Sequence, residues 1–393
     1  MLVSVPIRPP CVIVDERRLL PRFWATAWSF SLLAAGLSKN TFRLKLRHID
    51  AFYQFCDERF GTDAFDSAIS ERDAQAVSQM LEAFFHELTG RPNYNSTDVQ
   101  RWDMVRDFVQ HLARLRAPSD PAWSALSSFL YGMGRIRLPL AGQVQFIRAL
   151  PRETLEDLLE VAHPTSARNP FRGEVNRIRN WLAINLMLLT GLRRGEALIL
   201  SVNSLKREFD AKRGEMRGYL QIEESHEYDP RTTTPSLKTA RSFRRVPVSK
   251  SLSDLWDLYV QDYRSDSEEH GFLLSSREGK PWAAESLTAM MSRLSGALSP
   301  DARDRFFERS GGKETVSAHD LRHTCATARY QQLVGVPNSN SELVMQQMRA
   351  FFGWSYASKM PEHYARAAIE EDLAARWDDL FDARVSLLRG AMV

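Results

Sequence analysis

The sequence predicts a mainly α-helical protein with a small antiparallel β-sheet, divided into two domains. Apolar residues recur every three or four positions along most of the chain, which is the helical period. The alternation typical of strands is confined to residues 218–248. A basic, proline-containing stretch that begins GRIRLPLAG lacks helical period and separates a purely helical part from a mixed part. The predicted divisions are an extended leader (residues 1–20), a helical domain (21–133), a linker (134–149) and a second domain (150–393).

Composition indicates a globular protein but does not by itself identify its partner. The chain has 393 residues, 44% of them hydrophobic and 26% charged, which allows two domains with large cores. A net charge of +3 is too small to establish a nucleic-acid partner. The 3 cysteines are far apart and offer neither a disulfide framework nor a CxxC metal pair, so we expect a reducing cytoplasm. The apolar run Ala25–Leu37 is too short to cross a bilayer, and no membrane or export signal is predicted.

The first domain is predicted to contain a helix with a basic face. From residue 39 to residue 60, apolar residues occur at spacings of three and four, and Arg43, Lys45 and Arg47 occupy positions between them. Such a face either meets water or contacts DNA, and in isolation the two interpretations have equal weight. Further helices are predicted near residues 66–88, 96–116 and 121–133.

The second domain is predicted to combine helices with the sheet. Helices are expected from Pro151, over residues 174–190 with a stop at Gly191, and near residues 251–263 and 284–298. The polar segment 299–315 has few apolar anchors and is predicted to be a loop. Residues 367–388 form a strongly amphipathic pattern that predicts a C-terminal helix.

A stretch near the C-terminus carries the strongest chemical signal. In SAHDLRHTCATARY, His319 and Arg322 are one helical turn apart, so an imidazole and a guanidinium can reach one phosphate together. Trp354 and Tyr364 follow in FFGWSYASKMPEHYAR.

These residues resemble the signature of the tyrosine recombinase (phage integrase) family, in which a His-x-x-Arg motif precedes a Gly-His or Gly-Trp pair and a nucleophilic tyrosine. TGLRRGEALIL resembles the first arginine motif of the family, which places a catalytic arginine at Arg193 and a supporting acid at Glu196. A lysine on a β-hairpin enters the active site in this family, and Lys238 is its best match. The matched positions, in family order, are Arg193, Lys238, His319, Arg322, Trp354 and Tyr364. The resemblance implies a helical core-binding (SAM-like) domain followed by an α+β catalytic domain of the DNA breaking-rejoining type.

The hairpin region is also locally basic. The stretch that contains Lys238, Arg241, Arg244 and Arg245 holds no acidic residue, which predicts either a solvated basic hairpin or a surface that contacts DNA phosphates.

Attack on a phosphodiester adds negative charge to the phosphoryl oxygens, which the guanidinium groups of Arg193 and Arg322 can stabilise. Tyr364 needs help to lose its proton, and His319 is the candidate that accepts or orients it. Lys238 is the candidate donor to the leaving hydroxyl.

Metal and nucleotide chemistry is not supported by the sequence. His319 and His323 are four residues apart, but Asp320 stands where a zinc HExxH motif requires glutamate. His323 is therefore expected either to pack within the helix or to support the residues of the site from behind. No phosphate-binding loop or dinucleotide fingerprint is present, and we expect no cofactor.

The resemblance therefore implies a site-specific recombinase that cuts and rejoins duplex DNA through a 3′-phosphotyrosyl intermediate. The helix after the tyrosine often docks on a neighbouring protomer in family members, so we expect a homo-oligomer on DNA, a tetrameric synapse, with or without accessory proteins. The alternatives are a type IB topoisomerase and a DNA-binding accessory protein that has kept the fold and lost catalysis.

Overall fold

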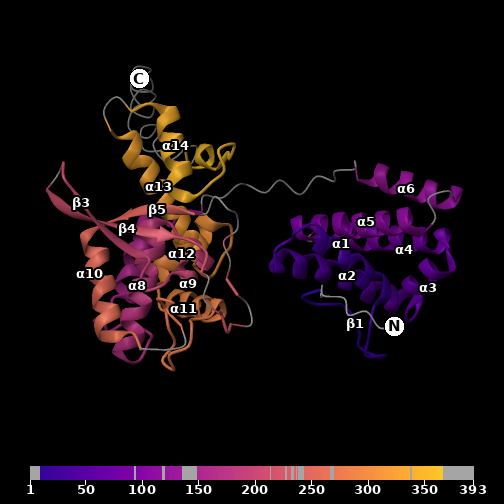
Figure 1. Cartoon of the computed structure of the whole chain (residues 1–393), viewed down its shortest axis with the longest axis horizontal. Coiled ribbons are helices and arrows are strands. Elements are labelled where there is room, and N and C mark those ends of the chain that lie inside the picture. Colours follow the sequence, from indigo (N-terminus) through magenta and orange to yellow (C-terminus); the bar gives the residue numbers. More distant parts are fainter. Residues whose placement is uncertain are drawn as a thin grey trace, which may run out of the picture. The chain divides into compact units, whose positions relative to one another are not determined.

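A computed structural model describes residues 9–92, 94–116, 120–134, 148–212, 214–225, 228–231, 234–235, 237, 243–265, 270–336 and 339–365. The chain forms two compact units, Met1–Val144 and Gln145–Val393 (Figure 1). The fold class is confirmed, because helices dominate and the sheets are small and antiparallel. Most of the predicted linker, residues 135–147, lies outside the described residues. No described helix is both long and apolar enough to cross a membrane.

The first unit is helical around an aromatic core. Phe42, Phe52, Phe65, Phe84 and Phe108 are all fully buried in it. The helices predicted over residues 39–60, 96–116 and 121–133 are confirmed. The helices are α1 (Phe23–Ala34), α2 (Lys39–Phe60), α3 (Ala64–Glu71), α4 (Ala74–Thr89), α5 (Ser96–Arg116) and α6 (Pro121–Met133).

The single helix predicted over residues 66–88 is wrong, because α3 and α4 are separate helices. Arg72 adopts a left-handed conformation with φ of 64°, which ends α3. Asp73 then caps α4 by accepting a hydrogen bond from the Ala76 amide at 2.9 Å.

Residues 1–20 were predicted to form an unpacked leader, and for residues 9–20, which the structure describes, this is wrong. Ile13 belongs to the core of the first unit. Strands β1 (Val14–Asp15) and β2 (Leu20–Pro21) pair as a short antiparallel ladder, and Asp15 forms an ion pair with the buried Arg22 at 3.2 Å. Two-residue strands are too short to produce an alternating sequence pattern, so the strands of this half were not predicted.

The second unit packs helices around a three-stranded antiparallel sheet. The strands are β3 (Leu205–Asp210), β4 (Glu215–Ile222) and β5 (Arg244–Val248), in the order β3-β4-β5. Leu220 of β4 lies opposite Val246 of β5, and both are buried. Helices α8 and α14 contact β5, and α8 also packs against α13 (Figure 1). The helices are α7 (Arg152–Ala162), α8 (Glu174–Thr190), α9 (Arg194–Ile199), α10 (Lys250–Leu258) with a π-helical turn η2 (Tyr259–Tyr263), α11 (Ala284–Gly296), α12 (Pro300–Ser310), α13 (Ala318–Val334) and α14 (Ser341–Phe352).

The segment predicted as a loop over residues 299–315 contains α12, so that prediction is wrong. Ser299 caps the helix by accepting from the Ala302 amide at 3.3 Å, and Pro300 occupies its first turn. Ala302 and Phe306 anchor the helix in the core. Two apolar residues on one face are enough because the rest of α12 meets water.

Candidate active site

The site begins at the junction between α8 and α9. Gly191 ends α8 in the left-handed conformation, with φ of 62°. A Cβ atom at this position would overlap the ring of Phe352, which is fully buried and cannot move aside. Only glycine therefore fits here, and the turn that it makes places Arg193 at the N-cap of α9.

Glu196 is the acid that organises the arginines. Its carboxylate accepts from Arg193 Nη1 at 2.6 Å and from Arg244 Nη2 at 2.9 Å, and Arg322 Nη1 lies 3.7 Å away. Burial alone would raise the pKa of Glu196, but the hydrogen bond and charge of Arg244, with the charges of Arg193 and Arg322, outweigh burial and lower the pKa. One buried carboxylate thus holds three guanidinium groups together.

Arg244 was predicted from the basic hairpin to contact DNA, but the structure buries it. Its side chain is 5% exposed. In addition to its bonds to Glu196, it donates from Nε to the Phe351 carbonyl oxygen at 2.8 Å. This is a correction: packing of β5 against α14 turns the guanidinium inward, where it supports the site from within.

Arg322 is held by backbone carbonyl groups on two sides. Its Nη1 donates to Gly191 O and its Nη2 donates to Phe352 O at 2.8 Å. Burial, together with the charge of Arg193, lowers the pKa of Arg322 to about 9. The group therefore remains protonated at neutral pH, and its orientation is fixed before any ligand arrives.

The start of α13 is fixed by a capping box. The Ser317 amide donates to Asp320 Oδ2 at 2.9 Å, and Ser317 Oγ accepts from the Asp320 amide at 3.4 Å. This geometry leaves His319 at the solvent surface, one turn before Arg322. Desolvation by the surrounding protein and the positive charges of Arg148 and Arg322 lower the pKa of His319.

Tyr364 lies against α13, in helical residues 360–365. Its hydroxyl is 2.8 Å from His323 Nδ1, and the residue is 3% exposed. Burial raises the pKa of Tyr364 and, with the charge of nearby His319, lowers the pKa of His323 to about 3. A pKa this low keeps His323 neutral. With the imidazole proton on Nε2, Nδ1 accepts a hydrogen bond from the Tyr364 hydroxyl. The tyrosine is protonated and shielded by burial.

Trp354 connects the tyrosine to the arginines. Its ring stacks on that of Tyr364 with centroids 5.4 Å apart and planes at 11°. It also stacks on Phe352 at 4.7 Å. The Arg322 guanidinium carbon lies 5.7 Å from the Trp354 ring centroid. The tryptophan therefore orders the wall between Tyr364 and Arg322.

The structure brings together most of the residues that the sequence selected. A chain of contacts joins them, from Glu196 through the arginines and Trp354 to Tyr364, His323 and His319; the rings of His323 and His319 are 4.4 Å apart. Lys238 and Arg241 lie outside the described residues, as does the predicted helix over residues 367–388. His323 was expected to pack or to support the site, and its contact with Tyr364 is such a support. Arg244 was expected to face DNA, and its inward position is the contribution that the sequence did not predict.

Cations predicted to contact DNA lie on both units. Arg47 is exposed on α2, while Arg43 and Lys45 are half-buried, and Lys45 Nζ contacts Met104 Sδ at 3.4 Å. Arg245 is exposed, pairs with Glu208 at 2.6 Å and lies over the Tyr219 ring at 4.7 Å.

Among the described residues, no group of three or more His, Cys, Asp or Glu side chains is placed to hold a metal ion. The His319 and His323 rings meet edge to face, and His323 Nδ1 is occupied by Tyr364.

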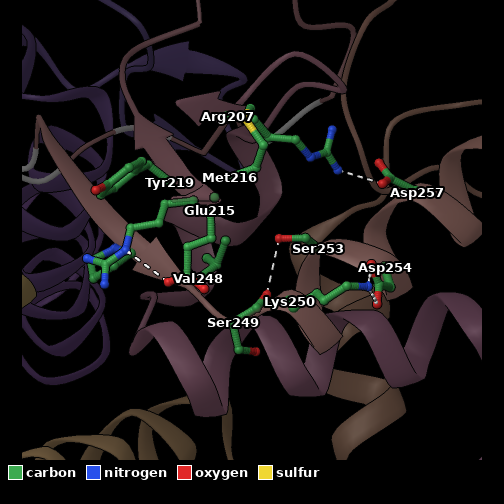
Figure 2. Close-up of a pocket in the computed structure, with 13 residues that line it drawn as sticks. Arg207, Glu215, Met216, Tyr219, Val248, Ser249, Lys250, Ser253, Asp254 and Asp257 are labelled. Atoms are coloured by element: carbon green, nitrogen blue, oxygen red, sulfur yellow. Dashed lines mark hydrogen bonds and ion pairs between the residues drawn. The ribbon is translucent and has the colours of Figure 1, made fainter. Parts of the chain in front are cut away.

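A cleft of about 650 Å³ lies away from these residues, between the sheet and α10 (Figure 2). Its charged side chains pair with one another: Arg207 with Asp257 at 2.5 Å, and Lys250 with Asp254 at 2.7 Å. Figure 2 shows these pairs along its rim. None of the residues of the arginine and tyrosine site lines this cleft, so its size does not make it the active site.

The comparison with known families agrees with the residues. The sequence model of the phage integrase family matches residues 148–368, more than half of the chain. The chain belongs to the phage integrase family. Its tyrosine recombinase motifs all fall within the matched region, which ends just after Tyr364. No curated protein sequence matches the chain.

Several solved recombinase structures are similar to this chain at low identity. The Tn1549 transposon integrase in complex with circular intermediate DNA is 16% identical, with 86% of this chain and 95% of that one covered and a TM-score of 0.49. A λ integrase dimer bound to a COC′ core site is 12% identical, with 85% and 94% covered and a TM-score of 0.44. The XerH site-specific recombinase bound to palindromic difH is 15% identical, with 69% and 71% covered and a TM-score of 0.41.

Proposed function

We propose that this tyrosine recombinase cuts and rejoins duplex DNA at a specific site through a covalent bond between Tyr364 and a 3′-phosphate. The observation that carries the proposal is the placement of the Tyr364 hydroxyl on His323, next to a tryptophan wall that contacts the preorganised Arg322. The reaction needs neither nucleotide nor metal, because the phosphotyrosine bond stores the energy of the cleaved phosphodiester.

The arginines stabilise the negative charge that develops on the phosphoryl oxygens. Tyr364 Oη attacks the phosphorus, the bond to the 5′ oxygen breaks, and the non-bridging oxygens gain negative charge in between. Arg193 and Arg322 can donate to these oxygens, and by analogy with a removed oxyanion-hole donor each contributes roughly 3 kcal/mol. Glu196 holds both guanidinium groups before the DNA binds.

The two histidines have different roles: His323 contacts the phenol of Tyr364, and His319 contacts the phosphate. Neutral His323 accepts the phenol hydrogen bond and positions Oη for attack. His319, at the surface one turn before Arg322, contacts the same phosphate from the solvent side. As the phosphotyrosine bond forms, the phenol proton passes to His323 Nδ1. As the bond to the 5′ oxygen breaks, Lys238 gives a proton to that oxygen, so the step balances.

The buried state of the tyrosine implies a conformational step. At 3% exposure, Tyr364 cannot meet a phosphate of duplex DNA in the arrangement seen here. DNA binding therefore has to uncover the tyrosine, by movement of helical residues 360–365 or by entry of the phosphate between Trp354 and α13.

DNA is held by both units in this proposal. The basic face of α2, with Arg43, Lys45 and Arg47, and the hairpin cations Arg241 and Arg245 contact phosphates. A homo-oligomeric synapse forms through residues 367–388, with or without accessory proteins.

Neither alternative is favoured. Family membership and the C-terminal segment beyond the tyrosine favour recombination over relaxation by a type IB topoisomerase. A silent accessory protein would not need Arg193, Arg322 and Tyr364 to be held in one connected site.

The experiment is to recover the DNA that becomes covalently attached to the protein in its host and to sequence it. We expect fragments with a common end at one site, absent when Tyr364→Phe replaces the unmodified protein. Random fragments, or the same fragments from both proteins, would contradict the proposal.

A further inference from the structure

A cleft between α8 and α11 is lined by arginines and by no acidic residue among the described part of the chain. Its volume is about 340 Å³, at the lower end of the range for small-ligand sites. Arg179 and Asn180 form its inner wall, Trp282 and Phe171 provide apolar surface, and Arg293 stands on the exposed side of α11.

Arg179 is a buried cation to which the described residues give no carboxylate partner. The residue is 8% exposed, and its guanidinium carbon lies 4.4 Å from the Trp282 ring centroid. It donates from Nη1 to Ser275 O at 3.1 Å and from Nη2 to Asn180 Oδ1 at 3.1 Å. Among the described residues no acid lies within ion-pair distance of it, and burial lowers the pKa of Arg179. A buried positive charge is costly unless an anion compensates it.

Asn180 supplies a second unsatisfied donor. The residue is 2% exposed, and because Oδ1 accepts from Arg179, Nδ2 has to point the other way. Nδ2 is buried and has no hydrogen-bond partner. Rotating the amide by 180° does not help, since it would aim the NH₂ group at the guanidinium. Because an unmet buried donor is unfavourable, this cleft favours a ligand that carries a hydrogen-bond acceptor.

Arg293 adds a second positive charge at the mouth of the cleft. Its guanidinium carbon lies 5.9 Å from the Phe171 ring centroid. Two arginines and one asparagine whose amide nitrogen has no acceptor among the described residues thus line the same cleft. We propose that this cleft binds a phosphoryl group, either of a small phosphate or of a DNA backbone. Planar guanidinium forks match its oxygens, and the amide of Asn180 takes a further oxygen.

This cleft is separate from the arginine and tyrosine site. None of the residues in the arginine and tyrosine site lines the cleft, so phosphate binding can be measured without DNA cleavage.

The first test is calorimetric titration of the whole chain with inorganic phosphate at constant ionic strength. We expect saturable binding to one site. Arg293→Gln, a change at an exposed position, should weaken binding about tenfold or more, as loss of a charge-assisted bond predicts. Arg172→Gln, which changes an exposed arginine outside the cleft, should leave binding unchanged.

Asn180→Asp is a second variant that is expected to fold and to lose phosphate binding. Its carboxylate still accepts from Arg179 and compensates the buried charge, so the thermal midpoint in chloride should be at or above that of the unmodified protein. The added negative charge should abolish phosphate binding. Phosphate binding that survives in Asn180→Asp would contradict the assignment.

The second test separates the two sources of the phosphoryl group. If a DNA backbone phosphate fills the cleft, Arg293→Gln should reduce the log–log salt slope of duplex binding by about 1, and Arg172→Gln should not. An unchanged slope together with binding of free phosphate identifies a small phosphate ligand. No phosphate binding and no slope change would overturn the proposal and leave a cleft that holds only water.

Discussion

Glu196 shows which residue contacts a sequence can reveal and which it cannot. Its contact with Arg193 joins two residues three positions apart in one motif, so the sequence could predict it. Its contact with Arg244 joins residues 48 positions apart, and nothing in the basic hairpin distinguishes Arg244 from Arg245. Burial separates the two: the Arg244 side chain is 5% exposed, whereas that of Arg245 is 46% exposed. Tertiary packing decides that difference.

His323 should make the stability of the second unit depend on pH. Its pKa is about 3 in the folded protein, below the reference value of about 6.5, so the unfolded chain binds more protons between these values. Stability from this group is therefore present above pH 6.5 and lost as pH falls. Between pH 6.5 and pH 5 we expect a loss of at most about 2 kcal/mol.

The matched variant is His323→Asn, whose side-chain oxygen can still accept from Tyr364 but does not titrate. In denaturant titrations, the unfolding free energy of the unmodified protein should fall relative to that of His323→Asn as the pH falls from 7 to 5. A difference that stays constant with pH would show that His323 is not held neutral. His323→Asn should also cleave DNA better than His323→Leu, which cannot accept the hydrogen bond.

Lys238 stays a prediction from sequence, and its role can be tested with a leaving group that needs no proton. DNA with a 5′-bridging sulfur departs as a thiolate, which is much less basic than an alkoxide. Lys238→Ala should therefore cut ordinary DNA poorly and the sulfur substrate nearly normally. Equal impairment on both substrates would make Lys238 a phosphate contact and not the acid.

At the scale of elements, apolar spacing predicted the longer helices, and local caps fix their ends in the structure. Ser38 caps α2 by accepting from the Thr41 amide at 3.3 Å, and Pro121 starts α6. The elements that were missed lack such signals or depend on partners. Strand β3 is mostly exposed and reads as a polar segment, and its pairing with β4 makes it a strand. The break before α4 rests on the left-handed Arg72, a residue type that gives no warning of it.

Gly191 is the glycine on which the element arrangement depends most. Gly191→Ala should destabilise the protein by more than about 1 kcal/mol, because alanine is strained at this positive φ and its Cβ would overlap Phe352. The displaced carbonyl would also release Arg322. Denaturant unfolding measures the first effect, and DNA cleavage by the folded fraction measures the second.

The control is Gly296→Ala, at the end of α11. A Cβ there meets nothing within 4 Å and φ is not positive, so this change should be neutral or stabilising by up to about 1 kcal/mol. Equal destabilisation by both changes would mean that the left-handed turn is not the cause.

At the scale of the whole molecule, the net charge does not indicate the function, whereas the order of the motifs indicates the family. A charge of +3 is compatible with many functions. The six family positions lie across 172 residues (from 193 to 364), and order alone could indicate the family because each motif keeps its local pattern. Among the described residues, five of these positions meet at one site, and that meeting depends on how α8, α9, α13 and α14 pack, which no local pattern specifies.

If the basic face of α2 contacts DNA, its removal should change the salt dependence of binding. Each neutralised phosphate contributes about 0.9 to the log–log slope, so alanine at Arg43, Lys45 and Arg47 should lower it by up to about 3. Arg59→Ala on the last turn of α2, where the guanidinium lies 5.9 Å from the Phe55 ring centroid, is the control and should leave the slope unchanged. A triple variant with the slope of the unmodified protein would show that this face only meets water.

The central claim is that Tyr364 is the nucleophile, and mapping a trapped adduct tests it most directly. A nicked suicide substrate carrying the native site, in excess chelator, should yield a covalent complex whose nucleotide-bearing peptide contains Tyr364. Tyr364→Phe keeps the ring and its stacking on Trp354, so the protein should fold and bind DNA but form no adduct. Tyr356→Phe, at a 71% exposed position, should form it normally. An adduct mapped to Tyr356, or one that forms in the Tyr364→Phe protein, would contradict the account.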